Sequence, residues 1–472
     1  MKLEQKILFA SIIFGLISTT TIFATTPYLE AAKAGNADAQ FKVGLSYVNG
    51  KEVSKDLKEA TRWFQKAAEQ GHTQSQFLLG SMYYNGAGVL EDKKTAAKWF
   101  RKAAEQGLMQ AQARLGNMYY NGLGVLEDKK TAAMWFQKAA KQGHENAQSR
   151  LGAMYYKGEG VQKNYKLAAT WFQKAEKQGN VEAQFYLGLM HYSGKGRIKD
   201  KKIAAKHFQT AANQGHIKAQ FYLGNMYYNG KGVTQDYKEA AMWSKKAAEQ
   251  GNIDAQFVLG VMYYNGEGVK KDLKEAVTWY RKAAEQGNAL AQHNLGLMYY
   301  NGKGVPKDYK KASKWSLKAA KQGNTQAQLQ LGVMYNKGKG VIKNTQEAAK
   351  WIQKAAKRGN PDAEYTLGLM YDIGKGVLQD QKEAARWIRK AAEQGNVLAQ
   401  SNLGLMYTKG KGVSKNLKEA YAWALLSAMN GNQTGIILKN KLKKALPSEQ
   451  QEFGLQRAKE LQKQIEENNA KK

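Results

Sequence analysis

Cysteine is entirely absent from the 472-residue chain, and this absence excludes several classes of protein. Without thiols there is no disulfide framework, no thiolate zinc or iron–sulfur centre, no cysteine nucleophile, and no lipid anchor on an N-terminal cysteine. Proline is scarce, with 4 residues, whereas the 47 glycines recur at fixed intervals. Scarce proline with periodic glycine indicates ordered repeats and not a flexible low-complexity chain.

Acidic residues are also in short supply, with 39 Asp and Glu against 73 Lys and Arg and a formal net charge of +34. Such a positive field attracts anionic surfaces and acidic partners without identifying them. We expect weak contact with anionic envelope polymers or membranes. No specific nucleic-acid target is expected, although the charge would bind nucleic acid non-specifically at low salt.

Long apolar runs are lacking after the N-terminus. Residues 1–24 are expected to be a secretory signal peptide, because Lys2 and Lys6 precede a mostly apolar stretch and Ala24 offers a small residue before a cut. The alternative is an uncleaved anchor, since the apolar run approaches spanning length. With cleavage no membrane span remains, so we expect an exported protein, either periplasmic or secreted.

A 36-residue period organises the rest of the chain. Glycine follows it from Gly44 to Gly404 without interruption, and tyrosine follows it from Tyr47 to Tyr407 with one exception. Eleven units therefore fill residues 36–431. All ten tryptophans lie in one such series, with a double step across His207: Trp63, Trp99, Trp135, Trp171, Trp243, Trp279, Trp315, Trp351, Trp387 and Trp423.

The unit at residues 252–287 predicts a pair of helices. Leu259 and Tyr263 share one helical face, and Gly266 is expected to end the first helix in the left-handed conformation. Asp272 begins the second helix with the spacing of a capping box. Gly260 sits inside the first helix, where it costs about 1 kcal/mol relative to alanine. We expect it to admit a close partner helix, with Trp279 filling the adjacent space.

These units resemble a known family of repeats. The shared pattern is A-x-x-x-L-G-x-x-Y, then G-x-G-V, then A-x-x-W-x-x-K-A-A-x-x-G, which is similar to the Sel-one-like repeat (SLR), a relative of the tetratricopeptide repeat. The resemblance implies an all-α, right-handed superhelical solenoid of eleven helix-turn-helix repeats with terminal capping helices. It also implies scaffold or adaptor work in protein complexes. In one unit the matching residues are Ala111, Leu115, Gly116, Tyr119, Gly122, Gly124, Val125, Ala132, Trp135, Ala139, Ala140 and Gly143.

The two ends of the array depart from the full repeat. Residues 25–35 resemble the second helix of a half repeat and are expected to cap the N-terminal end, because end units cannot leave apolar faces wet. Residues 432–472 are expected to form C-terminal capping helices. Their amphipathic stripe is predicted to consist of Phe453, Leu455, Ala458, Leu461 and Ile465.

The residue that follows the packed tyrosine is the best candidate for partner binding. In the related repeats the first helix faces the concave groove, so the resemblance places this residue there. Tyrosine suits such a surface, being rigid and amphipathic. The alternative is that these aromatics pack between adjacent repeats. The candidates are Tyr84, Tyr120, Tyr156, Tyr192, Tyr228, Tyr264 and Tyr300, with Phe77, Phe185, Phe221 and Phe257 as neighbours.

Two further features carry expectations. Lysines at fixed phases of the second helix, such as Lys66 and Lys102, lie off the tryptophan face and should be solvated. The fifth repeat replaces core residues with His191, Arg197 and His207. We expect a weakened joint between the helices there. The joint is either a pH-sensitive hinge, because histidine titrates near neutrality, or the result of sequence drift in a redundant array. Two histidines alone make a poor metal site.

Catalysis is not expected. We find no phosphate loop, metal-ligand cluster or nucleophile with a paired base, so we assign no catalytic residue, no metal and no cofactor. The alternative is a β-lactamase-like or penicillin-binding enzyme or cell-wall hydrolase, by analogy with a cysteine-rich branch of the resembled family. This chain lacks those cysteines and a convincing Ser-x-x-Lys motif, and analogy of fold alone is a weak warrant.

Overall fold

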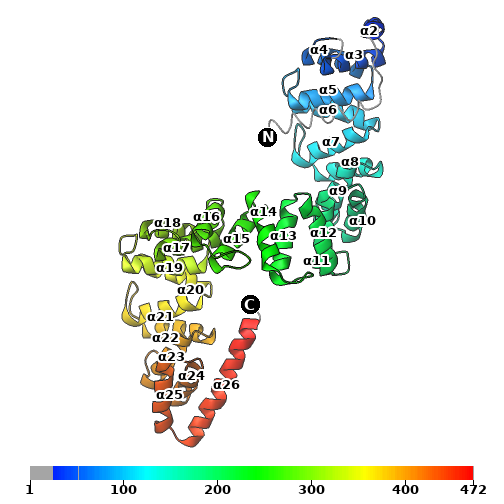
Figure 1. Cartoon of the computed structure of the whole chain (residues 1–472). Coiled ribbons are helices and arrows are strands. Elements are labelled where there is room, and N and C mark those ends of the chain that lie inside the picture. The colour runs from blue at the N-terminus through cyan, green and yellow to red at the C-terminus, as the bar shows by residue number, and fades with distance from the viewer. Residues whose placement is uncertain (1–24, 51–52, 471–472) are drawn as a thin grey trace. The chain divides into compact units, whose positions relative to one another are not determined.

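The structure is a computed structural model that describes residues 25–50 and 53–470 (Figure 1). The predicted signal peptide lies outside the described residues. Those residues form helices α2 to α26 and no strand. None of these helices combines the length and apolar character that a membrane crossing requires. The chain divides into unit 1, which ends at Gln235, and unit 2, which begins at Asp236.

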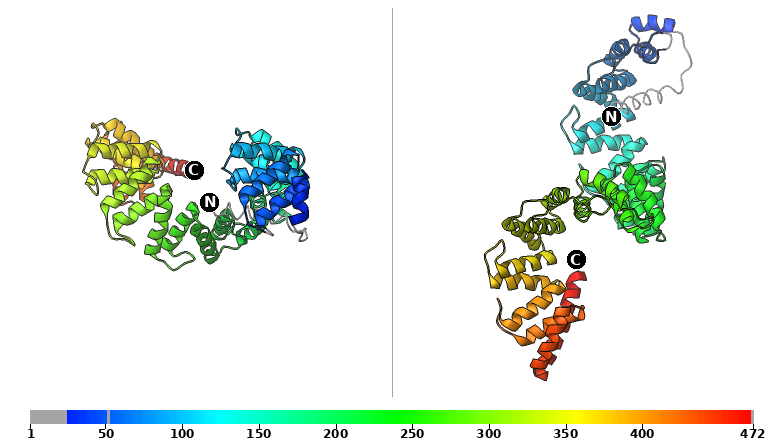
Figure 2. Two further views of the ribbon diagram at one scale, coloured as in Figure 1. Left: turned by 90° about the horizontal axis from the view of Figure 1, so that it is seen from above. Right: turned by 60° about the vertical axis from the view of Figure 1, so that its left-hand side comes forward.

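In both units the helices pack in consecutive pairs, each a first and a second helix of one repeat (Figures 1 and 2). This confirms the predicted all-α solenoid of eleven repeats. Unit 1 contains α2 (Thr25–Lys33), α3 (Ala37–Asn49), α4 (Leu57–Glu69), α5 (Thr73–Asn85), α6 (Lys93–Glu105), α7 (Met109–Asn121), α8 (Lys129–Lys141), α9 (Glu145–Lys157), α10 (Tyr165–Glu176), α11 (Val181–Ser193), α12 (Lys201–Asn213) and α13 (Ile217–Asn229).

Unit 2 continues the same alternation and ends in a longer helix. Its helices are α14 (Tyr237–Glu249), α15 (Ile253–Asn265), α16 (Leu273–Glu285), α17 (Ala289–Asn301), α18 (Tyr309–Lys321), α19 (Thr325–Lys337), α20 (Thr345–Lys357), α21 (Pro361–Ile373), α22 (Gln381–Glu393), α23 (Val397–Lys409), α24 (Leu417–Met429), α25 (Gln433–Ala445) and α26 (Ser448–Ala470).

Helix ends follow the local sequence closely. Gly266 closes α15 with φ +84°, the left-handed conformation that glycine adopts at little cost. Asp272 caps α16, its carboxylate accepting the backbone amides of Lys274 and Glu275 at 2.8 and 3.1 Å. First helices are capped by Asn or His, except α7, whose N-cap residue is Leu108 without a side-chain cap. His144 caps α9 with its ring, because Nδ1 accepts the Ala147 amide at 3.2 Å.

The recurring glycine of the first helix leaves a notch into which a side chain of the second helix packs. A Cβ on Gly260 would stand 2.6 Å from the Tyr280 ring, and one on Gly116 would stand 2.9 Å from the Phe136 ring. The prediction that Trp279 fills this space is wrong: the residue after the tryptophan does. The side chain of Trp351 instead belongs to a cluster with alanines of the preceding second helix.

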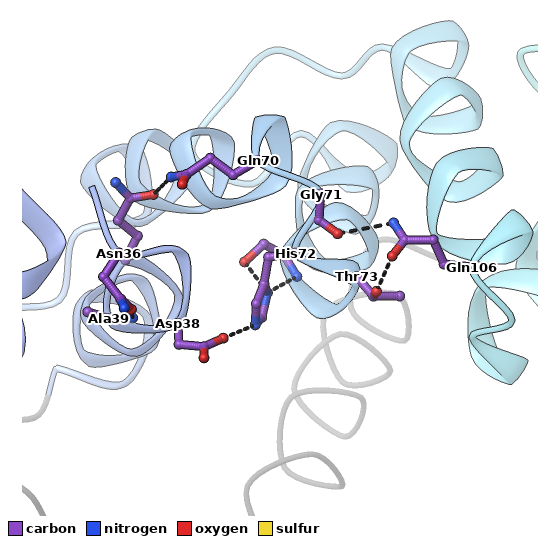
Figure 3. Close-up of polar contacts among 10 residues, drawn as sticks. Asn36, Asp38, Ala39, Gln70, Gly71, His72, Thr73 and Gln106 are labelled. Carbon is purple, nitrogen blue, oxygen red and sulfur yellow. Dashed lines mark hydrogen bonds and ion pairs between the residues drawn. The ribbon is translucent and has the colours of Figure 1, made fainter.

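A buried glutamine ties adjacent repeats together in most first helices, while α21 has the buried Glu364 at this position. Gln76 Nε2 donates to the Ala68 carbonyl at 3.1 Å, and Gln76 Oε1 accepts from Gln106 Nε2 at 2.8 Å. Gln106 Nε2 also donates to the Gly71 carbonyl, as Figure 3 shows. Equivalent glutamine pairs are Gln40 with Gln70, Gln112 with Gln142, Gln148 with Gln178, Gln184 with Gln214, Gln256 with Gln286, and Gln292 with Gln322.

At the N-terminal end of the described chain, α2 takes the place of a second helix. Gln40 Nε2 donates to the carbonyl of Ala32 in α2 at 3.1 Å. Gln76 makes the same bond to Ala68 in α4. Ala32 also packs in one cluster with Ala39 of α3 and Trp63 of α4. The half repeat therefore shields the apolar side of the first full repeat.

The last second helix, α24, is apolar on nearly every side. Ala422 and Leu426 are buried in α24, at positions that Arg386 and Lys390 occupy in the preceding repeat. These exchanges fit the contacts, because both α25 and α26 pack on α24. Apolar residues at these positions stabilise the packing of α24 against its neighbours, because a charge buried there without a partner would be costly.

Helix α26 binds α24 through a stripe shifted from the predicted one. Ala458, Leu461 and Ile465 are buried as expected. Phe453 and Leu455, which the stripe was predicted to include, are exposed instead. The reason is Gly454, which faces α24 so closely that a Cβ there would lie 2.6 Å from the Tyr421 ring.

Candidate interaction surface of the first helices

The seven candidate tyrosines occupy one position near the end of the first helix. Each lies two residues before the left-handed glycine that closes the helix, and each side chain is half-buried. None is therefore a pure core residue or a freely solvated one. The positions are Tyr84 in α5, Tyr120 in α7, Tyr156 in α9, Tyr192 in α11, Tyr228 in α13, Tyr264 in α15 and Tyr300 in α17.

Several of these tyrosines reach the loop of the next repeat. The Tyr120 hydroxyl donates to Glu159 Oε2 at 2.6 Å, and this bond raises the pKa of Tyr120 to about 12. Lys303 Nζ donates to the Tyr264 hydroxyl at 2.9 Å. In both pairs the partner stands 39 residues on, between the two glycines of the following loop. Tyr120 and Tyr264 therefore make contacts between adjacent repeats, as the predicted alternative describes.

Other tyrosines in the series make ring contacts with aromatic or cationic neighbours. Tyr156 meets Tyr165 and Tyr186 edge-on, with ring centroids 5.3 and 5.5 Å apart. The guanidinium of Arg114 lies 5.5 Å from the Tyr84 ring centroid, and Lys339 Nζ lies 5.1 Å from that of Tyr300. Such contacts hold the orientation of each ring, and each of these tyrosines stays half-buried.

The phenylalanine candidates divide into two groups. Phe77 and Phe185 are only 3% and 4% exposed, so they belong to the core and offer almost no surface to a partner. Their rings lie 5.6 and 5.8 Å from Phe100 and Phe208, which fill the glycine notches. This overturns their assignment as binding residues. The other two, Phe221 and Phe257, remain half-buried.

Tyr264 lines a pocket of about 310 Å³ in unit 2. First helices α15 and α17 form its walls, and Tyr280 of α16 contributes from the second helix. Burial raises the pKa of Tyr280 to about 12, so its hydroxyl stays protonated at neutral pH. The full lining is Val261, Tyr264, Asn265, Tyr280, Asn294, Leu297, Met298, Asn301 and Lys303.

The pocket combines an apolar interior with amide and ammonium groups. Leu297 and Met298 offer apolar surface, whereas Asn294, Asn301 and Lys303 offer hydrogen-bonding groups. These polar residues were not among the binding residues predicted from the sequence. One signal pointed to them: Tyr280 stands where phenylalanine fills the notch in earlier repeats, and a buried phenol usually has a polar partner. Here Asn294 hydrogen-bonds Tyr280.

The periodic lysines of the second helix are not simply solvated. Lys102 Nζ lies 4.4 Å from the Trp99 ring centroid, and Lys282 Nζ lies 4.0 Å from that of Trp279. Each lysine is three residues after its tryptophan, so both sit on one side of the helix. The same pairing joins Lys66 to Trp63, Lys138 to Trp135, Lys174 to Trp171, Lys246 to Trp243, Lys318 to Trp315, Lys354 to Trp351 and Lys390 to Trp387.

The polar residues that replace core residues in the fifth repeat contact one another and a neighbouring carboxylate. The rings of His191 and His207 stack across the helix pair with centroids 5.6 Å apart. His207 Nδ1 also lies 3.0 Å from Glu176 Oε1. Glu176 stands where the preceding repeats have an alanine. Burial lowers the pKa of His191, and the nearby His207 and Arg197 act in the same direction.

Two properties of the titratable side chains in the described residues bear on chemistry: whether they cluster as metal ligands, and whether their pKa values are shifted. Among these residues, no three His, Cys, Asp or Glu side chains gather as metal ligands. The strongly shifted pKa values belong to tyrosines held by burial or by a neighbouring carboxylate, such as Tyr186. These shifts follow from burial and from hydrogen bonding to neighbouring side chains.

Fold and surface together define a helical-repeat solenoid that displays half-buried tyrosines on its first helices. The chain belongs to the Sel1 repeat family, whose model matches eleven consecutive segments. The matched residues are 37–72, 73–108, 110–144, 146–180, 181–216, 217–252, 253–288, 289–324, 325–360, 361–396 and 397–432.

Two solved structures show what the chain is similar to. One is c5321, a protective antigen of uropathogenic Escherichia coli with an SLR fold, at 38% identity and a TM-score of 0.84, covering 94% of this chain and 95% of that one. The other is a Sel1 repeat protein from Oxalobacter formigenes, at 38% identity and a TM-score of 0.52, covering 66% of this chain and 90% of that one. No curated protein matches the chain.

Proposed function

We propose that the chain is a non-enzymatic scaffold or adaptor that binds other proteins through the tyrosine positions of its first helices. The pocket at Tyr264 carries the proposal. Its asparagine amides can pair with the backbone of an extended segment, while Leu297 and Val261 receive an apolar side chain. The fixed tyrosine rings supply contact area at low entropic cost.

Family membership supports the class of function, because stacked repeats present extended surfaces suited to protein partners. We place this activity outside the cytoplasm, in the bacterial envelope or at a host interface. The predicted signal peptide supports export. The Escherichia coli relative is described as a protective antigen, which supports a surface that meets the host.

Weak attraction to anionic envelope polymers is part of the proposal. The lysines over the tryptophans, such as Lys102, remain exposed. Their charges recur along the second helices with the period of the repeat. Salt should weaken this attraction strongly, since exposed charges are screened beyond about 10 Å at moderate ionic strength.

The test begins with photo-crosslinking in the native cell from the exposed pocket rim at Asn301, with the exposed Lys274 on a second helix as the control site. A protein captured only from Asn301 is then purified and titrated against the chain. We expect Asn294→Ala with Lys303→Glu to weaken binding about tenfold or more, and Lys274→Glu to leave it unchanged. Equal capture from both sites, or unchanged affinity in the double variant, would refute the proposal.

A further inference from the structure

The loops that join first to second helices line one edge of unit 2. A Cβ on Gly376 would overlap the carbonyl of Thr345, and one on Gly412 would overlap the carbonyl of Gln381. Each loop therefore lies on the start of the preceding second helix, so that loops of consecutive repeats stand beside one another (Figure 1). We call residues 337–343, 373–379 and 409–415 the basic loop edge.

Large aliphatic side chains protrude from this edge. Ile342 and Leu378 hold equivalent positions in adjacent loops and are 90% and 91% exposed, and Ile373 is 64% exposed. A lone exposed leucine is ordinary on a protein surface. Three branched aliphatics in two neighbouring loops form a repeated feature, and no described residue covers them.

Unpaired cations surround these aliphatics. The exposed lysines of the edge that make no ion pair with any described residue are Lys337, Lys343, Lys375, Lys409 and Lys415. Carboxylates are few, because Asn344 and Asn416 cap α20 and α24. Asp372, beside the edge, is neutralised by Lys411 at 2.7 Å. Asp380 follows the second loop and caps α22.

In unit 1, Ile198 protrudes from a basic loop, 87% exposed and between Arg197 and Lys199, whereas two other loops carry such protrusions with balanced charge. Leu90 and Leu126 are 91% and 90% exposed at the equivalent loop position. There, however, each leucine precedes a Glu-Asp pair, and Glu91 forms an ion pair with Lys93 at 3.1 Å. The two leucines thus provide a matched surface with balanced charge.

We propose that the basic loop edge docks on an anionic lipid bilayer. The aliphatic tips enter the interface between headgroups and acyl chains, while the lysines contact the anionic headgroups. Protruding apolar tips suit a fluid surface, which needs no matching hollow, whereas the pocket at Tyr264 suits a protein segment. This inference is independent of the proposed protein-binding function.

The test uses the purified mature chain and sedimentation with phosphatidylcholine vesicles, with and without phosphatidylglycerol. We expect binding to the anionic vesicles only, weakening as salt is added. The double variant Ile342→Ser with Leu378→Ser should reduce the partition constant about tenfold, and Lys343→Glu with Lys375→Glu should reduce it as well. Leu90→Ser with Leu126→Ser should leave it unchanged.

All of these side chains are exposed, so the variants should keep the melting temperature and the helical circular dichroism of the parent chain. Failure of the parent to bind anionic vesicles would overturn the proposal. So would binding that is insensitive to Ile342→Ser with Leu378→Ser, which would indicate charge attraction alone. An equal loss in the Leu90 and Leu126 variant would also overturn it.

Discussion

Gln106 Nε2 donates to Gln76 Oε1 at 2.8 Å, and this bond joins the end of the repeat to its own first helix. Gln106 Nε2 also donates to the carbonyl of Gly71, which lies at the end of the preceding repeat. Gln76 is buried, whereas Gln106 is exposed. A buried amide left unpaired costs more than a made bond gains. The paired glutamines therefore specify how one repeat is placed on the next, which apolar contacts alone would leave less strictly defined.

The break in this glutamine series at Arg358 predicts a stabilising substitution. Arg358 donates to the Gly323 carbonyl at 2.8 Å but leaves Gln328 Oε1 buried without a partner. Arg358→Gln should supply the missing donor and raise the free energy of unfolding by about 1 kcal/mol. Urea denaturation measures the change. The reverse exchange in the preceding repeat, Gln322→Arg, should lower stability, and a gain from both would refute the assignment.

Gly116 should not tolerate alanine although alanine favours helix formation by about 1 kcal/mol. The new Cβ would stand 2.9 Å from the rigid ring of Phe136, and such overpacking costs about 1–3 kcal/mol. We expect a net loss of stability in thermal melting. Gly296→Ala is the control, because its Cβ would meet the rotatable Ser316 hydroxyl. If both variants lost equally, the ring would not be the cause.

His144 should make folding sensitive to acid. Its Nδ1 must be unprotonated to accept the Ala147 amide, and burial lowers its pKa in the folded chain. A lowered folded pKa means that the cap's stability is present above the unfolded pKa of about 6.5 and is lost as pH falls through the folded pKa.

Asparagine caps the same position in other repeats without titrating, so His144→Asn isolates this effect. Melting temperatures at neutral and at mildly acidic pH provide the measurement. We expect the parent to lose more than the variant on acidification, by an amount consistent with one helix cap of about 1 kcal/mol. Identical acid dependence in the two proteins would contradict this role of the ring.

The fifth repeat should be strengthened by restoring its apolar residues together. His191→Tyr with His207→Trp alone would leave the Glu176 carboxylate against an indole, without its partner at 3.0 Å. Adding Glu176→Ala removes that unpaired charge. We expect the triple variant to exceed the parent by about 1–3 kcal/mol, the gain from burying large aromatic surface, and to exceed the double variant in thermal melting. An unchanged melting temperature in the triple variant would show that this joint is not weak.

The period of the repeat, the helix pairs and most helix ends could be predicted from the chain itself. Gly266, Asp272 and similar residues act within one or two turns of their own helix, so their effect does not depend on what packs nearby. The position of Tyr264 at the end of its helix was predictable for the same reason. Its exposure was not, because that depends on Lys303 in the next repeat.

What the sequence alone determined is therefore the local architecture: eleven helix pairs with capped ends. Only the tertiary structure decided that Tyr280 and not Trp279 fills the glycine notch, that Phe77 is core, and that Asn294 lines a pocket. The physical reason is the distance along the sequence over which each interaction acts. A cap or a turn is decided by neighbours along the chain, whereas burial and pairing between residues 18 to 39 positions apart depend on how each helix is rotated against the next repeat.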